Sequence, residues 1–285
     1  MPRFETEEKK IVDTLFGEQI ETNSNEEVYQ EELPDILFSQ PSGEQQRTLE
    51  LVNVPYYAPR IVIPQQLRDL IPYVDELSLY ETRWGYDRDK DESYDNWCVR
   101  VMPEASEVLN SIRGLCEREK IVSPQAVFSY VQAKANGSQI DFYDEEGKSV
   151  LCSATFQRRE DGFCLTDALE SDEFSPVAVI AVNMGKVASD TAKQWLLMGR
   201  DNDFRFLDGF VRETVKALAE YVAALVNREG RCVGDSVFLG MARDCDSRIQ
   251  QPLLDVLEAS RIGITFNRNF LMGPEYSALA LVLPR

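Results

Sequence analysis

The sequence contains no histidine. This absence excludes imidazole zinc sites, Ser-His-Asp and Cys-His nucleophilic catalysis, and histidine acid–base chemistry near neutral pH. Glycine-rich phosphate-binding motifs are also missing, since neither GxGxxG nor a Walker A sequence occurs. The chain therefore offers no familiar catalytic or nucleotide-binding motif, and no side chain stands out as an independent catalytic group.

Signals for membranes and secretion are absent as well. No apolar run approaches the length that spans a bilayer, and the N-terminal segment Met1–Glu8 lacks the apolar stretch of a signal peptide. The six cysteines form no CxxC pair, so we expect buried thiols in a reducing compartment. We therefore expect a cytoplasmic protein.

Positive charge is scarce, with 30 Lys and Arg against 49 Asp and Glu and a formal net charge of −19. Such a surface repels phosphate backbones and anionic membranes, so nucleic-acid and membrane partners are not expected. Residues 1–50 hold 13 acidic but only 4 basic residues. A run of this kind is typical of a solvated arm, which predicts an acidic N-terminal arm over 1–50 and a domain over 51–285.

Within that domain, hydrophobic spacing predicts helices over residues 64–80, 103–119, 204–228 and 247–260. Between them lie strand-like runs, over residues 126–133, 140–143, 149–156, 176–182 and twice within 263–284. Asn136-Gly137 between two such runs predicts a hairpin. Because the strands do not alternate strictly with helices, we expect an α+β fold: a central, mostly antiparallel twisted sheet with flanking helices.

Two charged patterns have simple structural readings. The acidic run Asp87–Asp95 lacks the glycine and the final glutamate of an EF-hand loop, which predicts a solvated loop. On the longest predicted helix, Glu213, Lys216 and Glu220 are spaced i, i+3 and i+7, which predicts a surface row of salt bridges.

Several short segments nevertheless follow one another in a recognisable order. Tyr73–Asp75 leads into the aromatic segment Leu79–Tyr86, and a hairpin runs from Ala126 to Tyr143. Further segments follow: Phe156–Arg159, Cys164–Asp167, Pro176–Val182, Ala219–Tyr221 and Ile262–Pro274. In this order, and over roughly residues 55–285, the chain resembles the activation domain of cobalamin-dependent methionine synthase.

The resemblance implies a role in cobalamin chemistry. The family domain binds S-adenosylmethionine in a groove and docks over the cobalamin module, where a flavodoxin-type donor reduces the inactive cobalt and the methyl donor remethylates it. This chain lacks the Asp-x-His-x-x-Gly cobalt motif, so cobalamin would be reached only through a partner: a cobalamin-dependent methyltransferase or another corrinoid protein. The implied S-adenosylmethionine residues are Asp75, Trp84, Glu220 and Arg243.

The chain also departs from the family. The Arg-x-x-Pro-Gly-Tyr-Pro signature keeps Arg243, but Asp244–Arg248 replaces its turn, which brings backbone close to the ligand. The family's ligand-contacting glutamate falls at or near Lys216, and Asp75 is the position that matches cleanly. Each candidate also has a structural alternative: a helix-end carboxylate for Asp75, a surface ion pair for Arg243 and a core aromatic for Trp84.

These observations support two hypotheses of different classes. In the first, the chain is a stand-alone accessory or reactivation-type protein that acts with a cobalamin-dependent methyltransferase in methionine synthesis and binds S-adenosylmethionine. In the second, it is a non-catalytic interaction module that kept the fold and lost the ligand, because a fold does not carry its function with it.

Overall fold

The computed structural model describes residues 57–158, 162, 164–169, 173–239, 249–267 and 271–284. The predicted acidic arm, residues 1–50, lies outside these residues, as does its boundary near residue 50. All of the described residues belong to one unit, Tyr56–Arg285.

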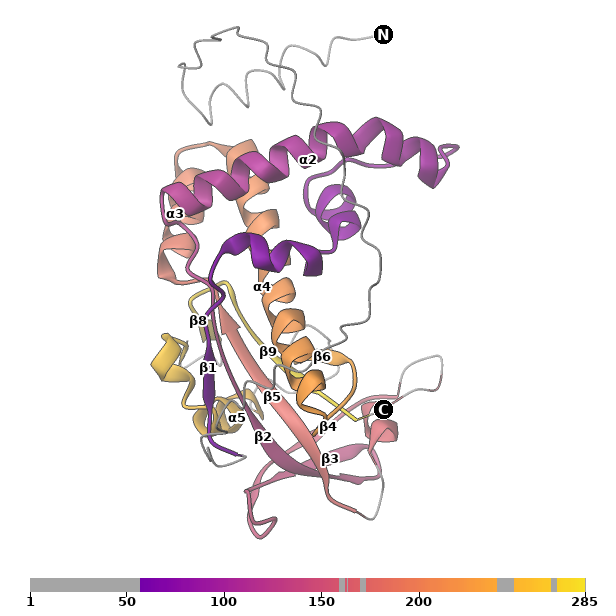
Figure 1. Cartoon of the computed structure of the whole chain (residues 1–285), viewed down its shortest axis with the longest axis vertical. Helices are drawn as coiled ribbons and strands as arrows, with labels where there is room; N and C mark the ends of the chain where they lie inside the picture. The colour runs from indigo at the N-terminus through magenta and orange to yellow at the C-terminus, as the bar shows by residue number, and fades with distance from the viewer. Residues whose placement is uncertain are drawn as a thin grey trace, which may run out of the picture. The chain divides into compact units, whose positions relative to one another are not determined.

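A single large antiparallel sheet organises this unit (Figure 1). Its strands lie in the order β4-β3-β2-β5-β9-β6, and β1 pairs with β2 outside that path. Every pairing between described strands is antiparallel, which confirms the predicted fold class. The strands are β1 (Arg60–Val62), β2 (Gln125–Asn136), β3 (Gln139–Tyr143), β4 (Val150–Thr155), β5 (Ser175–Asn183), β6 (Ser236–Leu239) and β9 (Ser277–Val282).

Strand β5 is buried on both faces of the sheet. Val177, Val179 and Ala181 belong to one hydrophobic cluster, whereas the alternating Ile180 and Val182 face the opposite side. All five side chains are 0% exposed. The sequence run from Pro176 to Val182, predicted as a strand, is therefore the centre of the core.

Helix α4 (Asp201–Glu229) covers one face of the sheet and packs on β5 and β9 (Figure 1). It matches the helix predicted over 204–228, and Gly230 ends it in the left-handed conformation, with φ 70°. At 1.5 Å per residue the helix is about 44 Å long. A second helix, α3 (Lys186–Leu197), packs against it and was not predicted.

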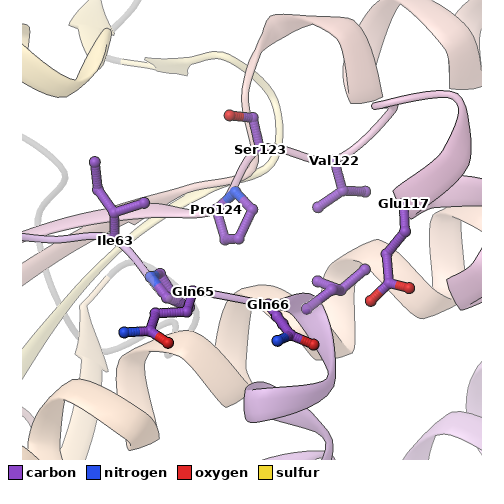
Figure 2. A pocket seen from close by; sticks show the side chains of 9 residues that line it. Ile63, Gln65, Gln66, Glu117, Val122, Ser123 and Pro124 are labelled. Atoms are coloured by element: carbon purple, nitrogen blue, oxygen red, sulfur yellow. The ribbon is translucent and has the colours of Figure 1, made fainter.

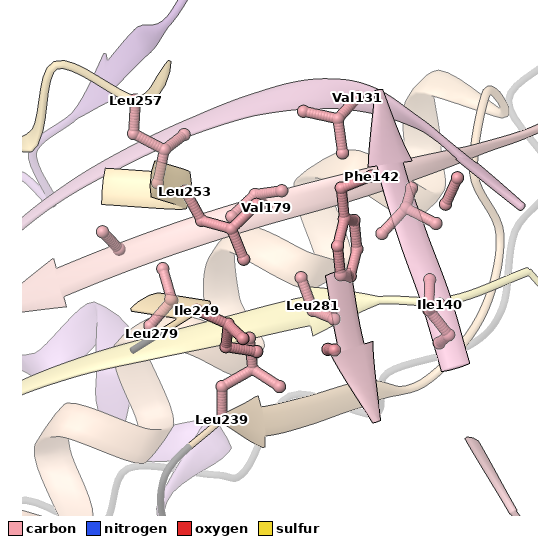
Figure 3. Close-up of a cluster of buried hydrophobic side chains, with 14 of the residues drawn as sticks. Val131, Ile140, Phe142, Val179, Leu239, Ile249, Leu253, Leu257, Leu279 and Leu281 are labelled. Carbon is pink, nitrogen blue, oxygen red and sulfur yellow. The ribbon is translucent and has the colours of Figure 1, made fainter. Parts of the chain in front are cut away.

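The opposite face carries a hydrophobic cluster of strand and helix side chains. Helix α5 (Gln250–Val256) and a 3-10 turn (Ala259–Ile262) cover this face, so the helix predicted over 247–260 is divided in two. Figure 3 shows Leu253 of α5 among strand side chains that include Val179 and Leu279. A short second sheet, β7 (Thr265–Phe266) with β8 (Met272–Gly273), lies between this region and β9 along the chain.

The prediction of one helix over residues 64–80 is wrong. The chain instead forms a 3-10 helix, η1 (Leu67–Tyr73), and then a π-helix, η2 (Ser78–Arg83). Pro72 lies inside η1 and cannot donate a helical hydrogen bond. Asp75 then starts a new segment, since its Oδ1 accepts a hydrogen bond from the Ser78 N–H at 3.0 Å.

Two further boundaries differ from the predictions. Helix α2 (Tyr94–Arg118) begins well before residue 103, because Ser93 caps it by accepting the Asn96 N–H at 3.3 Å; Pro103 lies inside it. The predicted hairpin is confirmed as β2–β3. The turn lies one residue later than predicted: Asn136 pairs with Gln139, so Gly137 and Ser138 form the two-residue turn. Gly137 has a φ of 62°, which glycine adopts without strain.

The segment η2 lies unusually close to α4 at Gly209. A Cβ at this position would be 2.9 Å from Arg83 Cβ and from Trp84 Cδ1 and Nε1. The Trp84 indole N–H donates to the Phe206 carbonyl at 3.1 Å and fixes the same contact. A residue with no side chain at 209 is therefore required for η2 to rest on the helix.

Two glycine-to-alanine variants test this contact. Gly209→Ala should destabilise the protein by about 1–3 kcal/mol, because the added methyl group overpacks the contact with Trp84. Gly114→Ala is the matched control: it is also helical, and nothing lies within 4 Å of its new Cβ. It should stabilise by about 0.5–1 kcal/mol. Urea unfolding measures both, and equal shifts of the same sign would contradict the close contact.

Candidate ligand-binding strip on helix α4

A buried carboxylate joins η2 to α4. The Glu213 side chain is 0% exposed. Its Oε1 accepts hydrogen bonds from Ser78 Oγ at 3.2 Å, Arg83 Nε at 2.9 Å and Lys216 Nζ at 2.9 Å. Arg83 and Lys216 are each 29% exposed, so their cationic groups reach solvent on the outer side of this carboxylate.

Asp75 lies at the same junction. Its exposed side chain caps the segment that leads into η2, through the Ser78 N–H, and the Ser78 hydroxyl in turn donates to Glu213. One serine thus bonds both carboxylates. The structure places Asp75 at a helix end, next to the cluster of Arg83, Glu213 and Lys216.

Glu220 follows on the same side of α4, one turn beyond Lys216. It is half-buried, and its Oε1 accepts a hydrogen bond from Ser236 Oγ, which joins the helix to β6. The neighbouring Tyr221 ring meets Tyr73 edge to face, with 5.7 Å between centroids. We call Asp75, Arg83, Glu213, Lys216 and Glu220 the α4–η2 strip.

Two of the predicted site residues are not part of this strip. Trp84 is 2% exposed and packs against Tyr80 and Phe206, so its side chain is a core residue that fixes η2 on α4. Arg243 lies outside the described residues. The structure therefore places Asp75 just before η2 and Glu220 on α4, and it uses Trp84 to hold η2 against this helix.

Sequence reasoning missed the role of Glu213 and Arg83. The spacing of Glu213, Lys216 and Glu220 predicted a surface row, and the Glu213–Lys216 pair does form. The row is not on the surface at Glu213, because the incoming η2 segment buries this carboxylate. Gly209, one turn earlier on the helix, is the sequence signal that something packs closely there.

The strip carries mixed charge; Glu213 is buried, and the other four side chains are at least partly exposed. It offers two cations and three carboxylates, and within the described residues no group of three or more Cys, Asp or Glu could hold a metal ion. The described cysteines are free thiols, and burial raises the pKa of Cys116 to about 12, which makes it a poor nucleophile. Mixed charges suit a ligand that carries both an ammonium and a carboxylate group.

A hollow of about 450 Å³ lies away from the strip, between the segment from β1 to η1 and the turn from α2 to β2 (Figure 2). The amides of Gln65 and Gln66 and the carboxylate of Glu117 border it, facing Val122 and Pro124. It contains none of the predicted site residues. In the described part of the chain, no helix is long and apolar enough to cross a membrane.

The strip makes a stability prediction. Glu213→Ala should cost about 2–4 kcal/mol, because it removes a carboxylate that accepts three charge-assisted or side-chain hydrogen bonds and leaves a void under η2. Glu146→Ala is the control, since its pair with Lys148 is exposed and contributes less than about 1 kcal/mol. Chemical unfolding of both variants measures the difference; similar small losses would mean that Glu213 is not the anchor.

Comparison with known proteins identifies the fold. No protein-family model matches the chain. An alignment of 271 residues covers 82% of the chain and shows 22% identity to methionine synthase of Mycobacterium tuberculosis (strain ATCC 25618 / H37Rv). The chain spans 23% of that protein's length. The crystal structure of a MetH reactivation domain bound to AdoHcy matches with a TM-score of 0.61 over 80% of each chain, at 17% identity. The predicted resemblance is thus confirmed: the chain has the fold of a methionine synthase reactivation domain.

Proposed function

We propose that this protein is a cytoplasmic accessory factor of the reactivation type, which acts with a cobalamin-dependent methyltransferase in methionine synthesis. The observation that supports this proposal is the fold likeness to a MetH reactivation domain across four fifths of both chains. The weaker sequence similarity to methionine synthase points the same way. Nucleic acid is not proposed as a partner, because the net charge of −19 opposes it.

S-adenosylmethionine is the ligand that we assign to the α4–η2 strip. Its amino-acid end carries one ammonium and one carboxylate group, and its sulfonium is a third charge. We assign the ammonium to Asp75, which is exposed beside η2. From the family resemblance alone we assign Arg243, which lies outside the described residues, to the carboxylate, and we assign Glu220 to the positively charged face of the ligand. Trp84 supports this arrangement from the core.

The chemistry in this proposal belongs to the partner and the ligand. The partner methyltransferase supplies cobalamin, a flavodoxin-type protein supplies the electron, and the sulfonium supplies the methyl group. This chain would orient the ligand, which lowers the barrier by positioning rather than by proton transfer. Its lack of histidine is compatible with such a role.

Calorimetric titration tests the ligand assignment. S-adenosylmethionine should bind with micromolar affinity, near −8 kcal/mol, and S-adenosylhomocysteine is the comparison ligand. Asp75→Asn keeps the helix cap but removes the charge, so it should weaken binding at least tenfold. Asp69→Asn is the matched control, because Asp69 accepts the Gln66 N–H at 3.0 Å in a similar cap. Equal affinities for both variants would remove Asp75 from the site.

A second candidate function has its own support. In the strip, Lys216 is engaged by Glu213 and Glu220 by Ser236, so part of its polar chemistry is satisfied within the protein. An interaction module that kept this fold and lost the ligand would show such contacts. Absence of calorimetric binding together with a stable protein complex would favour this function over the first.

The partner assignment is tested separately. We expect the purified chain to co-elute with a cobalamin-dependent methyltransferase in size-exclusion chromatography. It should also restore turnover of enzyme whose cobalt has been oxidised to Co(II), when S-adenosylmethionine and a flavodoxin-type reductant are present. If no complex forms and turnover stays unchanged, both functions proposed here fail.

A further inference from the structure

A second, larger cavity lies on a different part of the molecule. It has a volume of about 950 Å³, opens to solvent, and is bordered by α3, α4 and the β8–β9 segment, together with Leu239 of β6 and Gln250 of α5. Pockets of roughly 300–1,000 Å³ are typical of small-molecule sites. The cavity contains none of the residues of the α4–η2 strip, because it is lined by Arg212 and Val215 on α4 rather than by Glu213 or Lys216.

Two residues that line this cavity carry buried hydroxyl groups without a hydrogen-bond partner among the described residues. They are Ser189 Oγ, on the buried side of α3, and Ser277 Oγ, at the start of β9. Ser189 is 3% exposed. Buried polar side chains are normally bonded, and an unbonded one calls for a specific reason. Two such groups, 88 positions apart in the chain, line the same cavity.

Three cations, Lys186, Lys193 and Arg212, line the cavity together with the carboxylates of Asp190 and Glu275. Lys193 and Arg212 approach the same carboxylate, that of Glu275: Lys193 Nζ lies 3.8 Å from Oε2 and an Arg212 terminal nitrogen lies 3.2 Å from Oε1. Arg212 also pairs with Asp208 at 2.8 Å, and Lys186 pairs with Asp190 at 2.7 Å. Because Glu275 is 44% exposed, its side chain can turn toward solvent, which would release Lys193 and leave Arg212 paired with Asp208 alone.

The remaining wall is largely apolar. It includes Val215, Leu239, Leu271, Met272 and Pro274. A ligand that fits must therefore combine an apolar body with a charged head and a polar group for the two serines. A cationic head is disfavoured, because it would compete with both Lys193 and Arg212 for Glu275.

We propose that this cavity binds a small organic anion, with its anionic head between Lys193 and Arg212, its apolar body along Val215 and Met272, and a polar group at Ser189 and Ser277. The same two cations can bind a carboxylate, a sulfonate or a phosphate as the head group. The proposal concerns a site separate from the α4–η2 strip and does not rest on the proposed function.

The test uses 1-anilinonaphthalene-8-sulfonate, which has an aromatic body and a single anionic head, with the full chain. Fluorescence should show saturable binding of one equivalent. The uncharged N-phenyl-1-naphthylamine should bind at least tenfold more weakly. Lys193→Gln should weaken sulfonate binding about tenfold. Ser189→Ala should weaken it several-fold without lowering the melting temperature, since the Ser189 hydroxyl has no hydrogen-bond partner among the described residues.

Lys148→Gln is the control, because Lys148 is an exposed lysine of similar pairing at the β3–β4 turn, outside the cavity. It should leave sulfonate binding unchanged. The proposal is overturned if the sulfonate does not bind saturably or if the uncharged probe binds equally well. Equal losses in the Lys193 and Lys148 variants would also overturn it, because the attraction would then be unspecific.

Discussion

The contact of η2 with α4 is the constraint on which the candidate site depends. Gly209 lets the segment approach the helix, the Trp84 indole bonds to the helix backbone, and Glu213 receives Ser78, Arg83 and Lys216. Each element of this contact needs the others. Without the glycine the indole cannot reach Phe206, and without the segment Glu213 would lie in water and Asp75 would cap nothing beside α4.

Much of the fold follows from local patterns in the sequence. The run of β-branched residues at β5 and the long amphipathic pattern at α4 were predicted almost to their boundaries, because burial on both faces and a 3.6-residue period leave strong signals. The η1–η2 region was not predicted. Its geometry results from Pro72 and from packing on α4, and helical spacing alone does not distinguish α from 3-10 or π windings.

The site was predictable only in part, for a related reason. The family resemblance pointed to Asp75 and Glu220, and in the structure Asp75 caps the segment before η2 while Glu220 lies on α4; their role in ligand binding stays a prediction. It did not point to Glu213, because the burial of a carboxylate depends on which distant segment covers it. The sequence alone predicts that a row of charged residues on a helix is exposed to solvent. Here the covering segment, η2, lies about 130 residues earlier in the chain than Glu213.

The pairing order of the sheet has a consequence for how the chain is assembled. Strand β6 pairs only with β9 among the described strands, and β9 pairs with β5 across nearly a hundred intervening positions. During synthesis from the N-terminus, the edge of β5 that β9 will cover stays open while α3, α4, β6 and α5 are made. Non-local pairing of this kind slows folding and exposes an apolar strand edge to other chains. The half-made protein, rather than the finished one, is therefore the form most prone to aggregate.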